Sequence, residues 1–384
     1  MSKKLSIILI SIFSVMVGLW IWSFVAPKNY VILGGSTSVN PFMQHYTKTY
    51  YEETGQDFIY NSTGSQAGVS GVEKEMYGAG FISKDVTDAT LTDGYTFLDA
   101  TGIETEFSEA QNFKETMNKL EILGSEQGKH NSYVGFEFAL DAIVIIYKAP
   151  TWFTEQYEDK FNFKLENKTE NALKEIYNGG YTWAQLARDI DGGANVPPNS
   201  NERITTFTRE DGSGTRSAFS DLTGIKTMDT SNVVNSNGAM LENISSSGNA
   251  IGYVSYAFIK QITKESGVRV AGINDKKLGN PADAEENGEW EFAMKLNGDQ
   301  FEFDMSKTNE EFIKDEDGYE FKRPFVSIYN THSKHFNSLV DFFAEMIMAF
   351  DPKNPSNNFY QAIQQDFKDE GLVATFKLKQ GQGE

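Results

Sequence analysis

Residues 208–219 (TREDGSGTRSAF) combine side chains that suit the binding of a small oxyanion. Arg209 supplies a planar guanidinium that can donate two parallel hydrogen bonds to two oxygens of one anion. Ser213, Gly214 and Thr215 follow, and they offer two hydroxyl groups and backbone N–H groups with little side-chain bulk. If a helix begins in the residues that follow, these N–H groups lie at its positive end. The segment therefore predicts an anion-binding turn, although a glycine-rich turn that only caps a helix has the same composition.

Two earlier turns also present hydroxyl groups directly after short apolar segments. Residues 30–33 (YVIL) predict a buried strand that ends in a polar turn containing Thr37 and Ser38. Residues 58–60 (FIY) predict a second strand, and the turn that follows it contains Ser65. A repeated order of strand, polar turn and helix is typical of α/β proteins, in which helix N-termini gather at one edge of a sheet. Neutral donors with one arginine suit a dehydrated tetrahedral oxyanion, because every buried oxygen needs a donor.

The rest of the chain gives a coarser pattern. Residues 139–147 contain a β-branched run that predicts a central strand, whereas residues 84–134 are polar and mixed and predict no clear element. Residues 275–319 are acidic and predict a loop on the surface. Further strands are predicted at residues 203–207, 248–256 and 324–329, and helices at residues 173–177, 183–186, 336–350 and 359–368.

Length and composition restrict the class of protein. The 384 residues suffice for two domains, and 39% hydrophobic with 23% charged residues is typical of a globular chain. The net charge of −20 argues against a nucleic-acid partner, because that partner needs a basic surface. It does not argue against one small anion, which local dipoles and hydrogen bonds can hold. The absence of cysteine excludes disulfides, thiolate catalysis, cysteine metal ligands and lipid attachment at an N-terminal cysteine.

An uncharged segment, residues 5–26, follows Lys3 and Lys4 at the N-terminus. A helix of this length extends about 33 Å, which is enough to span the apolar core of a bilayer. Phe24 would precede a cut after Ala26 at a position where signal peptides carry a small residue. We therefore predict a single uncleaved transmembrane helix with the binding domain outside the cell membrane. A cleaved signal peptide and a buried helix of a soluble protein are the alternatives.

With these features the chain closely resembles the periplasmic-type phosphate-binding proteins that supply ABC transporters. The resemblance extends from about Val31 to the helix near Phe350 and rests on six motifs in the family's order, which together are specific. The motifs are residues 35–38 (GSTS) with Pro41, 64–65 (GS) with Gly68, 139–141 (ALD), 209–216 (REDGSGTR), 250–254 (AIGYV) and 323–325 (RPF).

The resemblance implies a type II periplasmic-binding-protein fold, in which two α/β lobes joined by two crossings close on inorganic phosphate. Such a protein is not an enzyme and needs no cofactor or metal. Its implied partners are phosphate and the permease subunits of an ABC transporter, and it is expected to be a monomer. With the crossings just before Ile143 and near Phe325, the implied parts are a membrane anchor, a first lobe and a second lobe, at residues 1–27, 28–142 plus 326–384, and 143–325.

The family's phosphate ligands carry over to eight positions of this sequence. The first lobe supplies four hydroxyl side chains and the second lobe supplies the arginine and the turn after it: Thr37, Ser38, Ser65, Ser83, Arg209, Ser213, Gly214 and Thr215. Asp211 stands where the family has an acidic residue that pairs with the arginine. The resemblance implies that the anion bridges the two lobes and stabilises their closed arrangement.

One position departs from the pattern of some family members, which carry an aspartate where this chain has Ser83. That aspartate accepts a hydrogen bond from the proton of hydrogen phosphate and rejects sulfate, which has no proton to donate. A serine can donate or accept, so discrimination between the two anions is less secure here. Asp85 and Asp141 are the candidates for a replacement acceptor.

The sequence also allows other interpretations than phosphate binding. A surface protein that keeps the fold but serves adhesion through residues 275–319 is one alternative, and a binder of another tetrahedral oxyanion such as sulfate is a second. A serine hydrolase centred on Ser213 is disfavoured, because the G-x-S-x-G spacing is absent and the histidines lie far away in the sequence. His332 and His335 are more typical of a solvated helix start than of a metal site.

Overall fold

The computed structural model describes residues 13–17, 30–165, 172–211, 213–285 and 288–379. The predicted N-terminal transmembrane helix, residues 5–26, lies outside the described residues except for 13–17, which are helical. Within the described part of the chain, no helix is both long enough and apolar enough to cross a membrane. The globular part begins at Tyr30 with the first strand.

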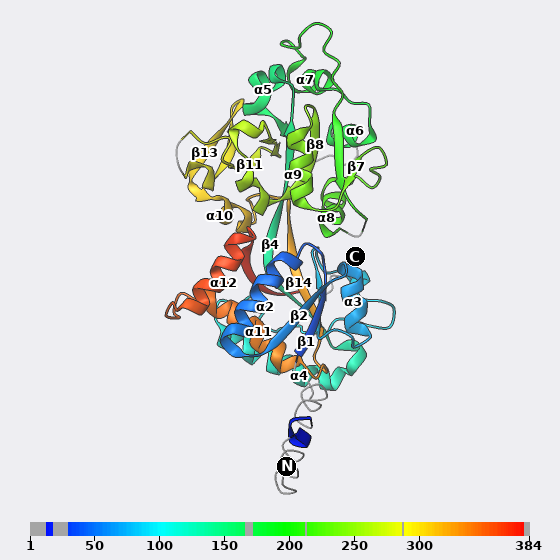
Figure 1. The fold of residues 1–384 in the computed structure, drawn as a ribbon, viewed down its shortest axis with the longest axis vertical. Coiled ribbons are helices and arrows are strands. Elements are labelled where there is room, and N and C mark those ends of the chain that lie inside the picture. The colour runs from blue at the N-terminus through cyan, green and yellow to red at the C-terminus, as the bar shows by residue number, and fades with distance from the viewer. Residues whose placement is uncertain (1–12, 18–29, 166–171, 212, 286–287, 380–384) are drawn as a thin grey trace, which may run out of the picture.

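Two α/β lobes, one above the other in Figure 1, make up the globular part. The first lobe contains β1 (Tyr30–Gly35), α2 (Asn40–Thr54), β2 (Asp57–Ser62), α3 (Ser65–Glu73), β3 (Ala79–Ile82), α4 (Ala110–Gln127), α11 (Phe336–Phe350), α12 (Asn358–Asp369) and β15 (Val373–Lys379). The second lobe contains α5 (Thr151–Tyr157), β5 (Asn162–Phe163), α6 (Ala172–Asn178), α7 (Trp183–Asp191), β6 (Thr205–Arg209), α8 (Gly214–Thr223), β7 (Asn232–Val234), α9 (Asn237–Ser246), β8 (Ala250–Ser255), β9 (Arg269–Val270), β10 (Gly272–Ile273), β11 (Lys276–Leu278), β12 (Phe292–Asn297), β13 (Gln300–Thr308) and α10 (Asn309–Lys314). Two long strands, β4 (Tyr133–Lys148) and β14 (Lys322–Asn330), lie between the two.

A mixed ten-stranded sheet extends through both lobes in the order β2-β1-β3-β14-β4-β8-β6-β7, with β15 and β9 also paired to β4. β1 pairs in parallel with β2 and with β3, so the three strands end at one edge of the sheet. α2 and α3 begin directly after β1 and β2, which brings their N-termini to that same edge. The parallel pairing therefore gathers the predicted hydroxyl-bearing turns.

Glycines allow α3 to lie directly on the ends of β1 and β3. A Cβ on Gly68 would come within 2.6 Å of the Cα of Gly35, and Gly35 itself has a φ of +142°. A side chain at Gly68 would push α3 away from the strands, and a Cβ at Gly35 would come within 2.2 Å of the carbonyl oxygen of Phe81 in β3. This close packing fixes the start of α3, and with it Ser65, beside the end of β1.

β4 and β14 connect the lobes. The first half of β4 pairs with β14 and β15, whereas its second half, from Ile143, pairs with β8 of the second lobe. β14 runs antiparallel to β4, and its register shifts between Phe325 and Val326. Each lobe has its own apolar core, so the two strands carry the chain from one core to the other.

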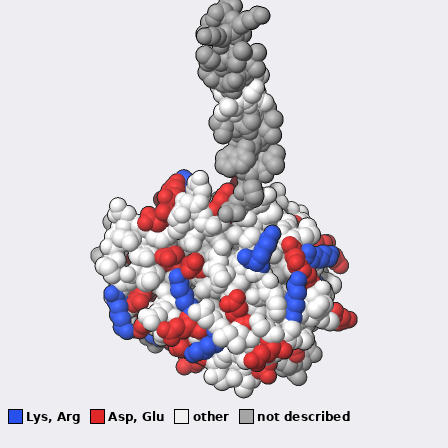
Figure 2. Space-filling view, turned by 90° about the horizontal axis from the view of Figure 1, so that it is seen from below, with Lys and Arg blue, Asp and Glu red and all other residues white. Residues whose placement is uncertain are grey.

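The two cores are rich in aromatic side chains. In the first lobe, Phe343 lies within ring-contact distance of Phe136 and Tyr329, and all three are fully buried. In the second lobe, Trp183 packs against Tyr147 of β4. Charged side chains of both signs are interspersed over the end of the first lobe (Figure 2). Each lobe is thus a packed unit around its own core.

The prediction that residues 275–319 form a surface loop is wrong. This segment contains β11, β12, β13 and α10, and the three strands form most of a five-stranded sheet in the order β13-β12-β11-β10-β5. Ala293, Met294 and Phe301 of these strands are buried, although the segment as a whole is rich in acidic residues. The high charge of the exposed positions hid the strand pattern. Residues 84–134, for which no element was predicted, contain α4.

Candidate anion-binding site

The turn that carries the strongest sequence signal leads from β6 into α8. Arg209 is the last residue of β6, and Ser213 is the N-cap of α8, its hydroxyl oxygen accepting from the N–H of Arg216 at 3.4 Å. Gly214 and Thr215 form the first turn, so the helix begins earlier than the sequence indicated. Their N–H groups lie at the positive end of the α8 dipole, where an anion is stabilised.

The first lobe presents its hydroxyl groups at the ends of neighbouring strands. Ser36, Thr37 and Ser38 follow β1, and Ser83 follows β3. The Ser36 hydroxyl donates to the Oγ of Ser83 at 2.8 Å, and both residues are buried. The Oγ1 of Thr37 is buried, and among the described residues it has no hydrogen-bond partner. Burying a hydroxyl without a partner is unfavourable, so this atom is available to a ligand.

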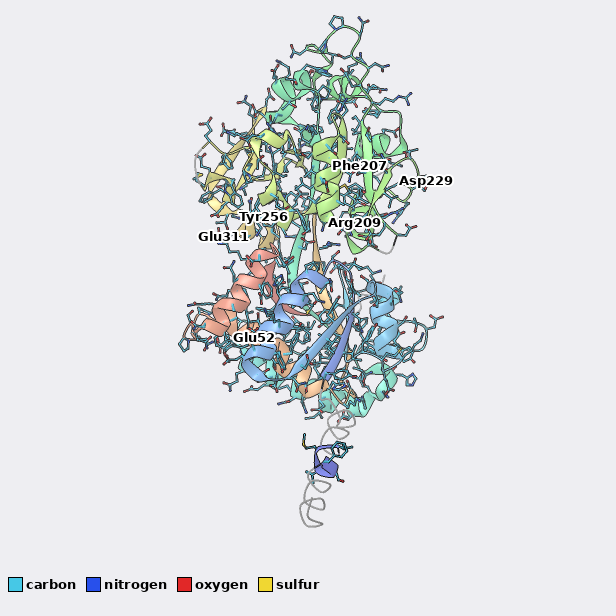
Figure 3. All side chains as sticks on the ribbon, viewed as in Figure 1. Glu52, Phe207, Arg209, Asp229, Tyr256 and Glu311 are labelled. Atoms are coloured by element: carbon cyan, nitrogen blue, oxygen red, sulfur yellow. The ribbon has the colours of Figure 1, made fainter. Side chains whose placement is uncertain are left out.

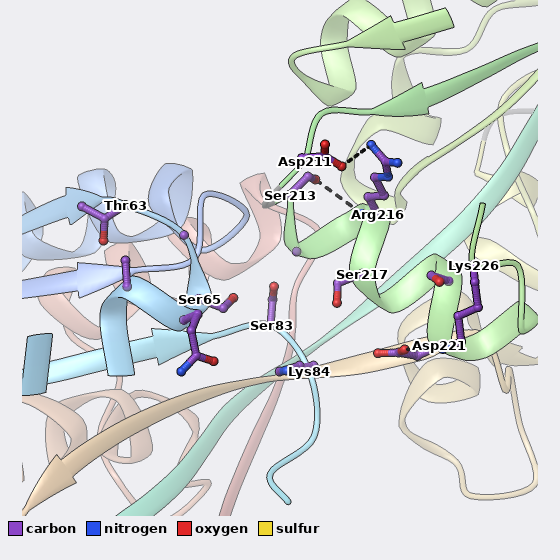
Figure 4. A pocket seen from close by; sticks show the side chains of 15 residues that line it. Thr63, Ser65, Ser83, Lys84, Asp211, Ser213, Arg216, Ser217, Asp221 and Lys226 are labelled. Atoms are coloured by element: carbon purple, nitrogen blue, oxygen red, sulfur yellow. Dashed lines mark hydrogen bonds and ion pairs between the residues drawn. The ribbon is translucent and has the colours of Figure 1, made fainter. Parts of the chain in front are cut away.

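The candidate residues of the two lobes meet in the cleft. The hydroxyl groups of Ser38 and Thr215 are 3.2 Å apart, although 177 positions separate them in the sequence. Gly214 lies so close to the first lobe that an added Cβ would be 1.9 Å from the Oγ of Ser83. Figure 4 shows Ser83 and Ser65 facing Ser213 across this cleft. The predicted donors therefore converge from both sides.

Two pockets adjoin this meeting point. One has a volume of about 460 Å³ and is lined by Ser65, Ser83, Ser213 and Gly214 among others. The other has a volume of about 310 Å³, and its lining includes Thr37, Ser38 and Arg209. Of the eight predicted ligands, Thr215 is in neither lining and bonds directly to Ser38. The structure thus brings all eight residues to the cleft, with seven of them divided between two pockets and Thr215 at the contact between the lobes.

Arg209 is nearly fully buried at the edge of the second lobe that faces the first (Figure 3). Its Nε and Nη2 donate to the two carboxylate oxygens of Glu210 at 2.9 Å each. Nη1 donates to the Oδ1 of Asn237 at 3.1 Å, and Nη2 also donates to the carbonyl oxygen of Asn235 at 3.4 Å. A guanidinium has five N–H groups, and the described residues accept from four of them, so one N–H on Nη1 has no partner among the described residues and can serve an anion.

The prediction that Asp211 orients Arg209 is wrong, because Glu210 takes that role. The side chain of Asp211 is 95% exposed and pairs with Arg216 at 2.7 Å. The chain turns at this point, with the N–H of Ser213 donating to the carbonyl of Glu210, and the turn directs Asp211 into solvent. Partial burial favours the neutral form of Glu210, but the hydrogen bonds from Arg209, a backbone hydrogen bond and the charges of Arg209 and Arg216 together outweigh it and lower the pKa of that carboxyl group.

We expect Glu210→Gln to weaken anion binding about tenfold, because the guanidinium loses a charge-assisted bidentate partner that holds its orientation. The matched variant Asp211→Asn should leave affinity within about twofold, since that side chain is exposed. Calorimetric titration of both variants measures the difference. A larger effect from Asp211→Asn than from Glu210→Gln would contradict the assignment.

Neither predicted replacement acceptor is free beside Ser83. Asp85 is exposed and pairs with Lys379 at 3.0 Å, away from the cleft. Asp141 is buried, but its Oδ1 accepts from the hydroxyl of Ser255 at 2.6 Å and its Oδ2 accepts from Arg323 at 2.8 and 3.0 Å. Asp85 is therefore wrong as a candidate, and Asp141 is already committed to other partners.

Sequence reasoning missed four residues that shape the site: Ser36, Glu210, Asn237 and Arg323. Ser36, Glu210 and Arg323 stand in three of the quoted motifs, residues 35–38, 209–216 and 323–325, so a signal for them was present in the sequence. Burial lowers the pKa of the Arg323 guanidinium, and the adjacent Asp141 opposes that shift. Asn237, the first residue of α9, had no comparable signal.

Two α/β lobes linked by long strands, with anion donors from both lobes in the cleft, define a solute-binding protein. The chain matches the family model described as a PBP superfamily domain over residues 25–350, and it belongs to that superfamily.

Named relatives are found by sequence and by structure. The phosphate-binding protein PstS of Borreliella burgdorferi is 24% identical over 255 residues, which cover 64% of this chain and 69% of that protein. A putative phosphate ABC transporter substrate-binding protein from Clostridium perfringens, solved with bound phosphate, is 19% identical with a TM-score of 0.51, covering 90% of this chain and 99% of that one. An ABC-type phosphate transport receptor from Vibrio cholerae is 18% identical with a TM-score of 0.52, covering 89% and 99%. The two structures support the fold.

Proposed function

We propose that this protein is an extracellular solute-binding subunit that captures inorganic phosphate between its lobes and delivers it to an ABC permease. The observation that carries the proposal is the meeting of Ser38 and Ser83 of the first lobe with Gly214 and Thr215 of the second, at the N-terminus of α8. A helix N-terminus with converging hydroxyl groups and a nearby guanidinium favours a small tetrahedral anion. The name of the Borreliella relative supports phosphate as that anion.

The proposed ligand set consists of the eight residues that converge in the cleft: Thr37, Ser38, Ser65, Ser83, Arg209, Ser213, Gly214 and Thr215. The proposed lobes are residues 28–142 plus 326–384 and residues 143–325, with β4 and β14 as the hinge. In the open protein the two sets of donors would be apart. Phosphate that contacts both sets would stabilise the closed arrangement by its additional contacts.

Calorimetric titration of the full chain, kept in detergent, with inorganic phosphate tests this function. We expect saturable binding of one phosphate per chain, together with a decrease in the radius of gyration measured by X-ray scattering. Absence of binding at about millimolar phosphate, which corresponds to a free energy near −4 kcal/mol, would refute the proposal.

We further propose that residues 1–27 hold the protein at the outer face of the cell membrane. The support is the uncharged segment of residues 5–26 after Lys3 and Lys4, which is long enough to cross a bilayer. Tethering would keep the binding domain at a high local concentration beside the permease. The expected result is that the chain stays in the membrane fraction after alkaline extraction and retains its N-terminal segment. A soluble product that begins after Ala26 would contradict the anchor.

A further inference from the structure

A buried ion pair joins the two strands that connect the lobes. Arg323 of β14 donates from Nε and Nη2 to the Oδ2 of Asp141 in β4, at 3.0 and 2.8 Å. Both side chains are almost completely buried. The Oδ1 of Asp141 accepts from Ser255 of β8. The guanidinium is therefore held at one place in the centre of the molecule, beside the cleft.

Arg323 also contacts one candidate ligand from each lobe. Its Nη2 donates to the Oγ1 of Thr215 at 3.0 Å, and its Nη1 approaches the Oγ of Ser83 at 3.5 Å. A guanidinium can only donate hydrogen bonds. Each hydroxyl oxygen therefore acts as the acceptor in its contact with Arg323, which leaves the proton of that hydroxyl for another partner.

Ser83 receives a second donor in addition to Arg323. The hydroxyl of Ser36 donates to the same Oγ at 2.8 Å. A hydroxyl oxygen has two acceptor lone pairs and one proton, so with both lone pairs occupied Ser83 can only donate to a ligand. The choice between donor and acceptor, which the sequence left open at this position, is decided by Ser36 and Arg323.

Four of the five carboxylates that line the two pockets pair with an arginine or a lysine: Asp141–Arg323, Glu210–Arg209, Asp211–Arg216 and Asp221–Lys226. The fifth, Glu370, lies 3.9 Å from the Nε2 of His45, beyond hydrogen-bond distance. The hydroxyl groups, the N-terminus of α8 and Arg209 can all donate to an anion. Among the described residues, the carboxylates of Asp141 and Glu210, which are hydrogen-bonded to the arginines at the meeting point of the lobes, are thus committed to those partners.

We propose that Arg323, held by Asp141, is a positioning residue that makes Ser83 a donor toward the anion and leaves the proton of Thr215 available for donation, so that the site also accepts sulfate and other tetrahedral oxyanions without a proton. This inference rests on the proposed phosphate-binding function and specifies the ligand class of the same site. A site with a buried acceptor leaves that acceptor unpaired when sulfate enters, and rejection by missing hydrogen bonds can reach about 10⁴-fold. A site of donors alone has no such unpaired group.

Calorimetry of the full chain with sodium phosphate and with sodium sulfate tests the proposal. We expect sulfate to bind within about 100-fold of phosphate, well short of the discrimination that a buried acceptor gives. If phosphate binds and the affinity for sulfate is more than about 100-fold lower, this inference is overturned and the proposed function stands. If neither anion binds, the proposed function itself fails.

A charge-neutral double variant, Asp141→Asn with Arg323→Gln, tests the positioning role without leaving one buried charge unpaired. It should raise the ratio of the sulfate to the phosphate dissociation constant about tenfold, because Ser83 regains a lone pair for the proton of phosphate. The matched control is Lys277→Gln with Asp283→Asn, which removes another buried ion pair, at 2.8 Å, in the second lobe. An unchanged ratio, or an equal change in the control, would overturn the role of Arg323.

Ser83→Asp provides a second test that keeps the ion pair. It places an acceptor at the end of β3, where the Nη1 of Arg323 lies close enough to keep the carboxylate ionised. The ratio of sulfate affinity to phosphate affinity should fall at least tenfold, even if the substitution changes both affinities. Equal losses for the two anions would show that the polarity of position 83 does not decide selectivity, which would overturn the proposal.

Discussion

Replacing Arg209 by alanine should weaken phosphate binding by about 10²–10³-fold, the largest effect we expect from a single side chain. Arg209 is the cation of the proposed site that lies beside the α8 N-terminus, and one of its N–H groups has no acceptor in the part of the chain that the structure describes. Its removal eliminates a charge-assisted hydrogen bond in a buried place, where such bonds are strong. The variant also leaves Glu210 without its bidentate partner, and the negative charge of that carboxylate then acts against the anion.

Calorimetric titration with phosphate measures this loss. The matched control is Arg203→Ala, because Arg203 is exposed and lies shortly before β6. The control should bind phosphate as the unmodified chain does, and circular dichroism should give the same spectrum for both variants. Undiminished binding by Arg209→Ala would show that the proposed site is wrong.

Replacing Gly214 by alanine should weaken phosphate binding by about 10- to 100-fold without lowering the thermal stability of the free protein. The added Cβ would lie 1.9 Å from the Oγ and 3.2 Å from the Cβ of Ser83 in the other lobe, and 3.1 Å from the Oγ of Ser36. Rotating the Ser83 hydroxyl away would break its hydrogen bond from Ser36 and would not move its Cβ. The closed arrangement therefore becomes strained, while α8 itself is not, because alanine suits a helix better than glycine.

The affinity lost in this variant equals the extra free energy of closing the lobes, because a ligand that needs the closed state binds in proportion to the population of that state. X-ray scattering with saturating phosphate should show a larger radius of gyration for Gly214→Ala than for the unmodified chain. Gly248→Ala is the matched control, because a Cβ at Gly248 meets no atom within 4 Å. Normal affinity and full compaction of Gly214→Ala would contradict closure at this contact.

Local sequence patterns were sufficient for the α/β class and for the turns that carry the site. Apolar segments such as residues 30–33 and 58–60 became β1 and β2, and a strand, β6, does precede the turn that contains Arg209. These features depend on hydrophobic periodicity and on turn and capping residues, which act over a few positions. Consecutive strand–helix units favour parallel pairing of their strands, as in β1, β2 and β3, and parallel pairing places their turns at one edge of the sheet.

The same local patterns failed where charged residues surround short strands or where a turn determined direction. The segment of residues 275–319 predicts a loop because it is rich in acidic residues, and its strands β12 and β13 bury few side chains and show no regular alternation of buried and exposed positions. The sequence predicts Asp211 as the partner of Arg209, but Glu210 is adjacent to it and carries the same type of side chain. Only the path of the chain between β6 and α8 decides which of them faces the guanidinium.

What the sequence by itself determined is thus the inventory of the site, namely the hydroxyl groups, the glycine, the arginine and the strand-to-helix turns that carry them. Tertiary structure alone decided which of these residues contact one another. It produced the contact between Ser38 and Thr215 and the ion pair between Asp141 and Arg323, whose partners are 182 positions apart. A hydroxyl group can donate or accept, and its polarity depends on neighbours that the fold brings from distant segments. The donor character of Ser83 is therefore a property of the folded molecule and cannot be read from residue 83.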